Sequence, residues 1–330
     1  MTARAGFRIA VVGATGALGT EVLAALDEAA FPVRELVLLA SEGSLASDVE
    51  FRGDAIPVES KLARLRGADL ALLCAPPAAS LAAAGDALRL EVPAIDLSGA
   101  LATRVEVPLA TGEAAFAGEP LVAVPAGPAL AWLRVLAPIH AALGLRRVVA
   151  TALAAAASAG RTGIEALSTE TVALLNQGDA PEPAALGHPI AFDCLPWVGD
   201  LAGDGSCRAE SELAAVLQRA LGGELGVAVT AVRVPTFCGD AASLALETAS
   251  PAEPAALVDL LRKSAGIEVA DADCPPSARA AAGSDRVYVG RVRRDPSRAG
   301  GVLLWLAADS LRLAAAQAVR LAAARLLARS

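Results

Sequence analysis

The sequence predicts an α/β protein that begins with a doubly wound parallel sheet and continues with an α+β domain. Three observations support this prediction. The chain has 330 residues, enough for two domains of roughly 100–200 residues each. Its first part alternates short apolar runs with segments of helical spacing, as in a parallel sheet with crossover helices. After residue 128 the strand-like runs are longer, and long strands with helices on one side favour an α+β arrangement.

The first domain opens with the strongest strand signal. Residues 7–12, FRIAVV, form a continuous apolar run, as expected of a strand buried on both faces, and residues 18–29 follow with helical spacing. The remaining strands of this sheet are expected at residues 33–41, 68–75, 92–97 and 121–125. The last strand ends in a sharp turn, PAGP, that leads into a helix. Many enzymes present a nucleophile on such a turn.

The second domain is expected to alternate strands and helices less regularly. Its strands are expected at residues 147–157, 224–234, 242–248, 287–292 and 302–307. Its helices are expected at residues 161–176, 209–221 and 254–264, and a terminal helix at 310–327.

Composition argues against several classes of protein. The longest uncharged runs contain prolines and fall short of the ~18–20 residues that a membrane span needs, and no signal-type segment precedes the first strand. We therefore expect a soluble, cytoplasmic protein. The net charge of −8 and the dispersed basic residues argue against nucleic acid as a partner. Five cysteines without a CxxC pair, and only two histidines, argue against a metal site.

A glycine-rich loop directly follows the first strand. Residues 13–19 read GATGALG, in which Gly13 allows a turn, Gly16 allows close approach of a pyrophosphate, and Gly19 allows the helix to pack on the strand. The N–H groups at the start of the helix can then bind the phosphates. A glycine turn can also be purely structural, but this context favours a dinucleotide. The candidate cofactor-binding residues of the loop are Gly13, Thr15, Gly16, Ala17, Leu18 and Gly19.

The end of the second strand should contact the adenosine ribose. The sequence there is Ser41-Glu42-Gly43-Ser44. Glu42 either accepts a hydrogen bond from the ribose 2′-hydroxyl, which would favour NAD, or is a solvated loop residue. No arginine lies in this stretch to bind a 2′-phosphate. The sequence leaves NAD and NADP open as the cofactor.

Motifs that resemble one known family are spread over nearly the whole chain, in the family's order. They are IAVVGATGALG, FPVRELVLLASE, IDLSGAL, GIEALSTETVALLN, IAFDCLP, VRVPTFCGD, VYVGRVRRDP and LLWLAADSLR. On these motifs the sequence resembles the aspartate-semialdehyde dehydrogenase family. IDLSGAL and the aspartate of TFCGD are more similar still to the Usg-type proteins, a divergent branch of that family.

The resemblance implies a fold, a partner and a reaction. The fold is a Rossmann-type dinucleotide-binding domain at residues 1–127, which a C-terminal helix at 309–330 rejoins, and an α+β dimerisation and substrate domain at 128–308. The partner is a second copy of the chain. The reaction, in amino-acid biosynthesis, is the reductive dephosphorylation of aspartyl phosphate to the semialdehyde with NADPH. It proceeds through an acyl-enzyme on a cysteine thiolate, and a histidine assists proton transfer.

When the family's functional residues are placed on this sequence one by one, the cofactor loop matches, but most of the family's catalytic residues are replaced. The nucleophile position is Gly127, and the histidine position, seven residues after the substrate arginine Arg233, is Asp240. The positions that match the family are the glycine loop, Ser41, Ser44, Gly160, Glu210 and Arg233. The other departures are Ala154 for a glutamine, Ala102 for a phosphate-binding arginine (with Arg104 nearby), Glu212 for a phosphate-binding lysine, and Gly43 for the arginine that reads the NADP 2′-phosphate.

The missing thiol removes the standard covalent chemistry. Glycine has no side chain, so no acyl-enzyme can form at Gly127. Cys238, two residues before Asp240, is either a relocated nucleophile or a small buried side chain.

The charges at the implied site also change. Asp240 is either a weak base or half of a structural pair with Arg233, and the nearby positive charge should lower the pKa of Asp240 and keep it ionised. We expect Arg233 to face Glu210, Glu212 and Asp240, and these carboxylates disfavour a phosphate ligand there. The sequence offers no role for His140 or His188, and we expect Arg291, Arg293 and Arg294 to lie on a solvated strand end.

Three functions remain open. The first is a dimer that binds a dinucleotide and has lost the standard catalysis. The second is a working oxidoreductase that transfers hydride directly to or from NAD(P) with altered chemistry, using Arg233 and Asp240. The third is a dimer whose cofactor pocket is also degraded.

Overall fold

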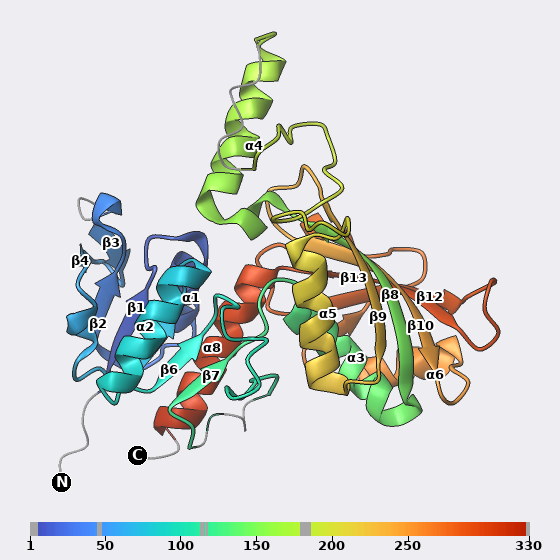
Figure 1. The fold of residues 1–330 in the computed structure, drawn as a ribbon, viewed down its shortest axis with the longest axis horizontal. Helices are drawn as coiled ribbons and strands as arrows, with labels where there is room; N and C mark the ends of the chain where they lie inside the picture. The colour runs from blue at the N-terminus through green and yellow to red at the C-terminus, as the bar shows by residue number, and fades with distance from the viewer. Residues whose placement is uncertain (1–5, 45–47, 113–115, 117, 179–185, 328–330) are drawn as a thin grey trace. The chain divides into compact units, whose positions relative to one another are not determined.

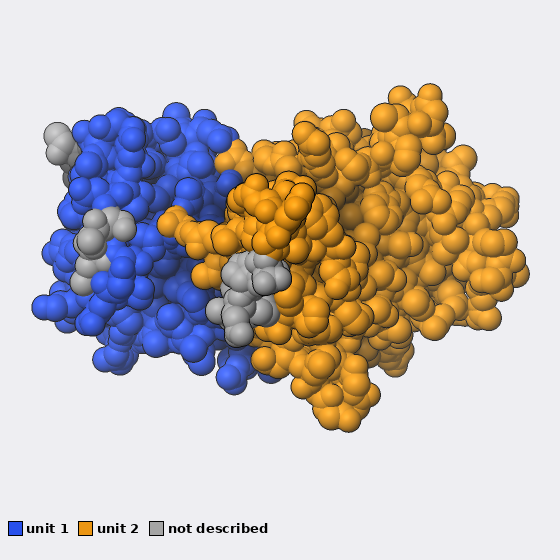
Figure 2. Space-filling model, turned by 90° about the horizontal axis from the view of Figure 1, so that it is seen from above, with its two compact units in different colours: residues 1–126, 314–330 blue, residues 127–313 orange. Residues whose placement is uncertain are grey.

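The computed structural model describes residues 6–44, 48–112, 116, 118–178 and 186–327 (Figure 1). The chain divides into two compact units, which Figure 2 shows in different colours. Unit 1 comprises Met1–Ala126 with Ala314–Ser330, and unit 2 comprises Gly127–Leu313. Among the described residues, no helix combines the length and apolar character needed to cross a membrane.

Unit 1 contains a seven-stranded sheet in the order β3-β4-β2-β1-β5-β6-β7. Its strands are β1 Phe7–Val12, β2 Val33–Leu39, β3 Asp48–Phe51, β4 Asp54–Glu59, β5 Leu70–Leu73, β6 Ala94–Asp96 and β7 Leu121–Ala123. Its first two helices are α1 Ala17–Glu28 and α2 Pro77–Arg89, and two short 3₁₀ turns, η1 Glu42–Ser44 and η2 Leu62–Leu65, follow β2 and β4. Every neighbouring pair except β3–β4 is parallel. The predicted α/β fold class is confirmed.

The hairpin of β3 and β4 is the part of this sheet that the sequence did not reveal. Its strands are antiparallel and lie at the sheet edge, so the expectation of a purely parallel sheet is wrong there. Arg52 and Gly53 form the turn, with φ of +55° and +84°, as in a tight hairpin turn. Both strands are short and rich in charged residues, and therefore lack the apolar run that marks a buried strand.

Unit 2 contains a six-stranded sheet in the order β11-β12-β13-β10-β8-β9. Its strands are β8 Leu145–Ala154, β9 Gly226–Arg233, β10 Asp240–Thr248, β11 Ile267–Val269, β12 Val287–Arg294 and β13 Val302–Ala308. Its helical segments are α3 Ala129–Leu143, η4 Ala156–Ala159, α4 Gly160–Leu175, α5 Arg208–Leu221, α6 Pro254–Arg262 and α7 Ala278–Ala281. The predicted strands and helices of this domain are all present, and the short β11 and α7 are additional.

Helices cover one face of the unit 2 sheet. Helix α3 contacts β8 and β12, α5 contacts β9, and α6 contacts β11 and β12 (Figure 1). Trp132 of α3 is completely buried, because α3 is apolar on nearly all sides. Helix α8, Ser310–Leu326, begins in unit 2, and its residues from Ala314 onward belong to unit 1. Near its end the Arg325 guanidinium stacks 4.8 Å from the Phe116 ring within unit 1.

Candidate functional site

The glycine loop is shaped by contacts that exclude side chains. Gly13 has φ of +86°, and a Cβ there would lie 2.5 Å from the backbone nitrogen of Ala75. A Cβ on Gly19 would lie 2.2 Å from the carbonyl oxygen of Gly13. Real Cβ atoms do not approach backbone atoms so closely, so only glycine fits at either position. The predicted roles of Gly13 in the turn and of Gly19 in helix packing both agree with this geometry.

The loop lies where dinucleotides bind in this type of sheet. Strand β1 lies between β2 and β5, and the chain leaves it first toward one side and later toward the other. Ligands bind at the carboxyl ends of the strands at such a switch point. Helix α1 begins at Ala17 with Gly16 as its N-cap and no capping side chain. Its first N–H groups have no acceptor within the helix, so they can bind phosphate.

The segment after β2 is exposed and close to the loop. The carbonyl oxygen of Leu39 accepts hydrogen bonds from the N–H groups of Gly13 and Ala14 at 2.7 and 3.2 Å. Ser41 and Glu42 are exposed, Ser44 is half-buried, and residues 42–44 form the 3₁₀ turn η1. The carbonyl oxygen of Leu39 therefore joins the end of β2 to the start of the glycine loop.

A buried aspartate organises the IDLSGAL loop. Asp96 is fully buried, and its carboxylate accepts hydrogen bonds from the N–H and hydroxyl of Ser98 at 3.0 and 2.6 Å and from the N–H of Leu101 at 2.9 Å. Burial raises the pKa of Asp96, and these hydrogen bonds oppose the rise. A Cβ on Gly99 would lie 2.8 Å from the Cβ of Ala126, so this loop packs against the turn after β7. Asp96 was not singled out from the sequence, although a lone aspartate in an apolar run could have indicated such an anchor.

Gly127, the nucleophile position, is exposed and has φ of +55°. A Cβ built on it meets no atom within 4 Å. Helix α3 begins two residues later, after Pro128 as its N-cap. The turn thus has room for a side chain and carries none.

Asp240, the histidine position, is committed to structural hydrogen bonds. It is 7% exposed, its Oδ1 accepts the N–H of Ala155 at 2.9 Å, and its Oδ2 accepts the hydroxyl of Ser310. The pKa of Asp240 is raised, chiefly by burial and also by the charge of Asp309. The hydrogen bonds from Ser310 and Ala155 and the charge of Arg233 act in the opposite direction. The prediction of a lowered pKa is wrong, because burial is the largest effect.

Arg233 is also buried, at 6% exposed. Its Nη1 donates to the carbonyl oxygen of Ala155 at 3.2 Å and to the hydroxyl of Ser158 at 2.8 Å. In the described part of the chain Arg233 and Asp240 form no direct ion pair, contrary to the structural pair considered from the sequence. They are instead joined through Ala155. Burial lowers the pKa of Arg233, and Asp240 acts in the opposite direction.

The two glutamates predicted to face Arg233 bond elsewhere. Glu210 accepts the N–H of Cys207 at 2.8 Å, as part of a capping box of α5, and the N–H of Ala231 at 2.9 Å. Glu212 is exposed and lies 3.9 Å from Arg208, one turn earlier on α5. The expectation that three carboxylates face Arg233 is therefore wrong for these two.

The other positions at which the family has a functional residue carry a small residue here or lie on the surface. Ala154 ends β8 and is buried, and Gly160 follows with φ of +73° and ψ of −161°, a conformation essentially restricted to glycine. Ala102 is 2% exposed, and Arg104 lies on the exposed turn after it. The structure brings Ala154, Arg233 and Asp240 together in unit 2.

Several other reactive side chains lie outside this cluster. Cys238 is exposed, so the interpretation of it as a small buried side chain is wrong. Nδ1 of His140 accepts the N–H of Leu145 at 3.1 Å, and His188 is exposed beside Trp197. Over the described residues, no group of three or more histidine, cysteine or acidic side chains could hold a metal ion. The strand-end residues Arg291, Arg293 and Arg294 are exposed, as expected, and Arg294 pairs with Glu253.

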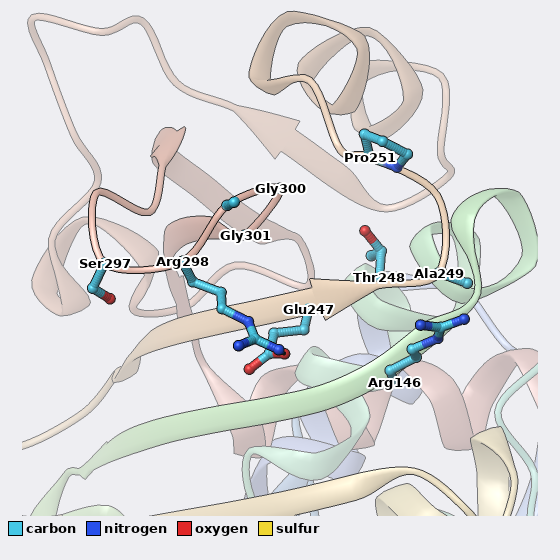
Figure 3. A pocket seen from close by; sticks show the side chains of 10 residues that line it. Arg146, Glu247, Thr248, Ala249, Pro251, Ser297, Arg298, Gly300 and Gly301 are labelled. Atoms are coloured by element: carbon cyan, nitrogen blue, oxygen red, sulfur yellow. The ribbon is translucent and has the colours of Figure 1, made fainter.

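A surface cavity of about 460 Å³ lies at the other end of β8 and β10 (Figure 3). Two of its lining residues, Glu247 and Arg298, form an ion pair at 2.8 Å, and Glu247 also lies 3.1 Å from Arg147 on β8. Glu247 is seven residues from Asp240 along β10, or roughly 23 Å at ~3.3 Å per residue. The described residues that line the cavity include no cysteine or histidine, and the cavity is separate from the cluster at Asp240.

Comparison with known proteins covers both units. Residues 8–117 match the family model described as the semialdehyde dehydrogenase NAD binding domain, and residues 136–313 match that of the semialdehyde dehydrogenase dimerisation domain. The chain is 34% identical over 319 residues to the "Aspartate-semialdehyde dehydrogenase 2" of Vibrio cholerae, with 94% of each covered. It is 35% identical over 316 residues to a "USG-1 protein homolog" of Pseudomonas aeruginosa, with 93% of this chain and 94% of that protein covered.

The fold of the chain is also similar to that of a solved structure. The crystal structure of Vibrio cholerae aspartate semialdehyde dehydrogenase II, in complex with ASA, superposes with a TM-score of 0.90 at 33% identity. The match covers 98% of this chain and 99% of that one.

Proposed function

The chain belongs to the aspartate-semialdehyde dehydrogenase family, in its Usg-type branch, and from that premise we propose a function without the family's thiolate chemistry. In this proposal the protein is a homodimer that binds a nicotinamide dinucleotide. It does not interconvert aspartyl phosphate and the semialdehyde.

The observation that carries the proposal is the bare turn at Gly127. Acyl transfer through a covalent intermediate requires a nucleophilic side chain beside the hydride donor. Gly127 offers only backbone, although the space around its Cα is open. Of the five cysteines, Cys74 and Cys207 are buried, and the three exposed ones, Cys194, Cys238 and Cys274, do not lie in this turn.

The position that would supply a proton carrier supports the same conclusion. A general base needs a free lone pair directed at the substrate. Both carboxylate oxygens of Asp240 accept hydrogen bonds within the chain, from Ala155 and Ser310, and the side chain is buried. Asp240 therefore fits a structural anchor better than a base, and this weighs against an altered oxidoreductase that uses it.

The cofactor loop supports retained dinucleotide binding. Gly13 and Gly19 lie in contacts that only glycine permits, and the N-terminus of α1 is without a capping side chain. The residues of unit 1 proposed to hold the cofactor are Gly13, Thr15, Gly16, Ala17, Leu18, Gly19, Ser41 and Ser44. When bound, the cofactor would supply a hydride donor or acceptor.

Arg233 is the proposed contact for a small anionic ligand. A guanidinium has five N–H donors, and the two described hydrogen bonds of Arg233 use Nη1. The planar guanidinium suits a carboxylate. Glu212, at the family's phosphate-binding lysine position, is an acid on the surface of α5, so a phosphate group loses that contact.

The surface of the unit 2 sheet supports a homodimer. Thr230, Thr151 and Ser243 lie side by side across β9, β8 and β10, and all three are exposed. Small side chains in a row let a second sheet pack at ~10 Å. The match of this unit to a dimerisation domain points to a second copy of the chain as the partner.

The proposal is tested by assaying purified protein with aspartate semialdehyde, phosphate and NAD or NADP, and by titrating the same protein with NADH and NADPH. We expect reduced cofactor to bind and no turnover above a no-enzyme control. Turnover that is abolished by alkylating the thiols would refute the loss of thiolate chemistry. Turnover that resists alkylation would favour an oxidoreductase with direct hydride transfer, and binding of neither cofactor would indicate a degraded pocket.

A further inference from the structure

We infer that Glu42 makes the adenosine-ribose subsite select NAD(H) over NADP(H). The inference rests on the proposed binding of a nicotinamide dinucleotide and adds which one is bound.

The backbone places Glu42 beside the glycine loop. Leu39 is the last residue of β2, and its carbonyl oxygen accepts the N–H groups of both Gly13 and Ala14. Glu42 follows three residues later and begins η1. When pyrophosphate lies at the N-terminus of the first helix, the adenosine ribose lies at the end of the second strand. The η1 turn is therefore the segment nearest to the ribose 2′ position.

The chemistry of Glu42 distinguishes the two cofactors. An ionised carboxylate only accepts hydrogen bonds, so it suits the 2′-hydroxyl of NAD and has nothing to donate to a 2′-phosphate. At 4 Å in water, each pair of like unit charges costs about 1 kcal/mol. A dianionic 2′-phosphate would therefore bind about thirtyfold more weakly than a hydroxyl, a factor equivalent to ~2 kcal/mol.

Cationic residues follow β4, the strand beside β2, and the η1 turn itself has none. Gly43 has no side chain, and a Cβ there would meet no atom within 4 Å, so nothing else fills the turn. Arg64 is held by Glu59 at 2.9 Å. Lys61 is exposed, but it follows β4, which lies on the side of β2 away from β1 and its glycine loop. The carbonyl oxygen of Glu59, two residues before Lys61, accepts the N–H of Ala40 at the end of β2 at 2.9 Å, so the charge of Lys61 is tested by its own substitution below.

The test is a titration of the full chain with NADH and with NADPH, in which binding is monitored by the fluorescence of the nicotinamide. We expect NADH to bind ten- to a hundredfold more tightly than NADPH. In Glu42→Gln, NADH binding should weaken, NADPH binding should tighten, and the preference should fall to within about threefold. Glu50→Gln is the matched control, because Glu50 is also an exposed glutamate of unit 1, on β3, and should leave both affinities unchanged.

The outcomes separate the inference from the proposed function. Equal or tighter binding of NADPH by the unaltered protein would overturn the inference and leave the proposed function intact. Loss of NADPH binding in Lys61→Gln, with no effect of Glu42→Gln, would assign selection to Lys61 and also overturn it. Binding of neither cofactor would overturn the proposed function and, with it, this inference.

Discussion

Arg233 and Asp240 both form hydrogen bonds with the backbone of Ala155, one with its carbonyl oxygen and the other with its N–H. Asp240 accepts the Ala155 N–H at 2.9 Å, and Arg233 donates to the Ala155 carbonyl oxygen at 3.2 Å. Asp240 also accepts the hydroxyl of Ser310, the first residue of α8. One buried carboxyl therefore ties the end of β8 to the start of the C-terminal helix, and catalysis is not needed to explain its position.

Asp240→Ala should destabilise unit 2 by about 2 kcal/mol, because the N–H of Ala155 and the hydroxyl of Ser310 lose their acceptor. Asp240→Asn should cost less, since its amide oxygen can still accept the N–H of Ala155. All three tryptophans, Trp132, Trp197 and Trp305, lie in unit 2, so tryptophan fluorescence during urea unfolding measures this change. Equal stability of the unaltered protein and Asp240→Ala would contradict the anchoring role.

The stability contributed by Asp240 should depend on pH. Its pKa is raised in the folded state, so between the unfolded value of ~3.9 and the raised folded value the native state binds more protons than the unfolded state. Stability from this group is therefore greatest at low pH and falls as pH rises through that window. The free energy of unfolding of the unaltered protein relative to Asp240→Asn should decrease from pH 4 upward and then level off. An increase over the same range would show that the carboxyl is stabilised in its ionised form.

Glu210 and Glu212 should behave differently although they lie two residues apart on α5. Glu210→Ala removes a capping-box carboxylate and the acceptor of the Ala231 N–H, and should cost about 1–2 kcal/mol in the free energy of unfolding. Glu212→Ala removes only an exposed contact with Arg208 and should cost less than about 0.5 kcal/mol. Similar losses from both substitutions in urea unfolding would contradict the structural role of Glu210.

Gly19→Ala should abolish binding of NADH and NADPH, because the new methyl group would have to displace the backbone at Gly13. Overpacking at this contact should also cost about 1–3 kcal/mol of stability. Gly85→Ala is the matched control, since Gly85 lies on α2, outside the loop, its methyl group meets no atom within 4 Å, and it should leave cofactor binding unchanged. Fluorescence titration with each cofactor provides the measurement. Normal binding by Gly19→Ala would indicate that the loop is not the cofactor site.

Ser243→Arg should convert a dimer into monomers, because it places a charge at one end of the row of small side chains on the open sheet face. Ala220 is an exposed residue of α5, away from this row, and Ala220→Arg should leave the dimer intact. Sedimentation velocity of both variants and the unaltered protein distinguishes these outcomes. An unaltered protein that sediments as a monomer would contradict the proposed homodimer.

The sequence predicted the elements that carry a strong periodic or apolar signal. FRIAVV and GATGALG together identified β1, the turn and α1, because apolar runs and obligatory glycines are local properties. The hairpin at β3 and β4 was missed, since its charged strands gain their structure from pairing at the sheet edge.

The hydrogen bonds of the candidate site could not be predicted in the same way. The pKa of Asp240 was expected to fall because Arg233 is close in sequence. The structure shows a rise, because the burial of Asp240 is produced by β8, β10 and α8 together. Likewise, only the packing of α5 on β9 shows that Glu210 bonds to Ala231 and not to Arg233.

Gly127→Cys should not restore the family's reaction, because Ala154, Asp240 and Glu212 also differ from the family pattern. The substitution is feasible sterically, although a non-glycine residue at φ of +55° costs about 1–2 kcal/mol. Because Cys194, Cys238 and Cys274 are already exposed, the variant should label with one more equivalent of a thiol reagent than the unaltered protein, which would show that the position is accessible. A steady-state assay that detected strong rescue would mean that the other departures matter little.

The central claim is that this polypeptide forms no covalent acyl intermediate. Intact-mass spectrometry of protein that is acid-quenched during incubation with aspartate semialdehyde and oxidised NAD or NADP tests it most directly. We expect only the unmodified mass. An added aspartyl group that hydroxylamine releases from a cysteine would contradict the account.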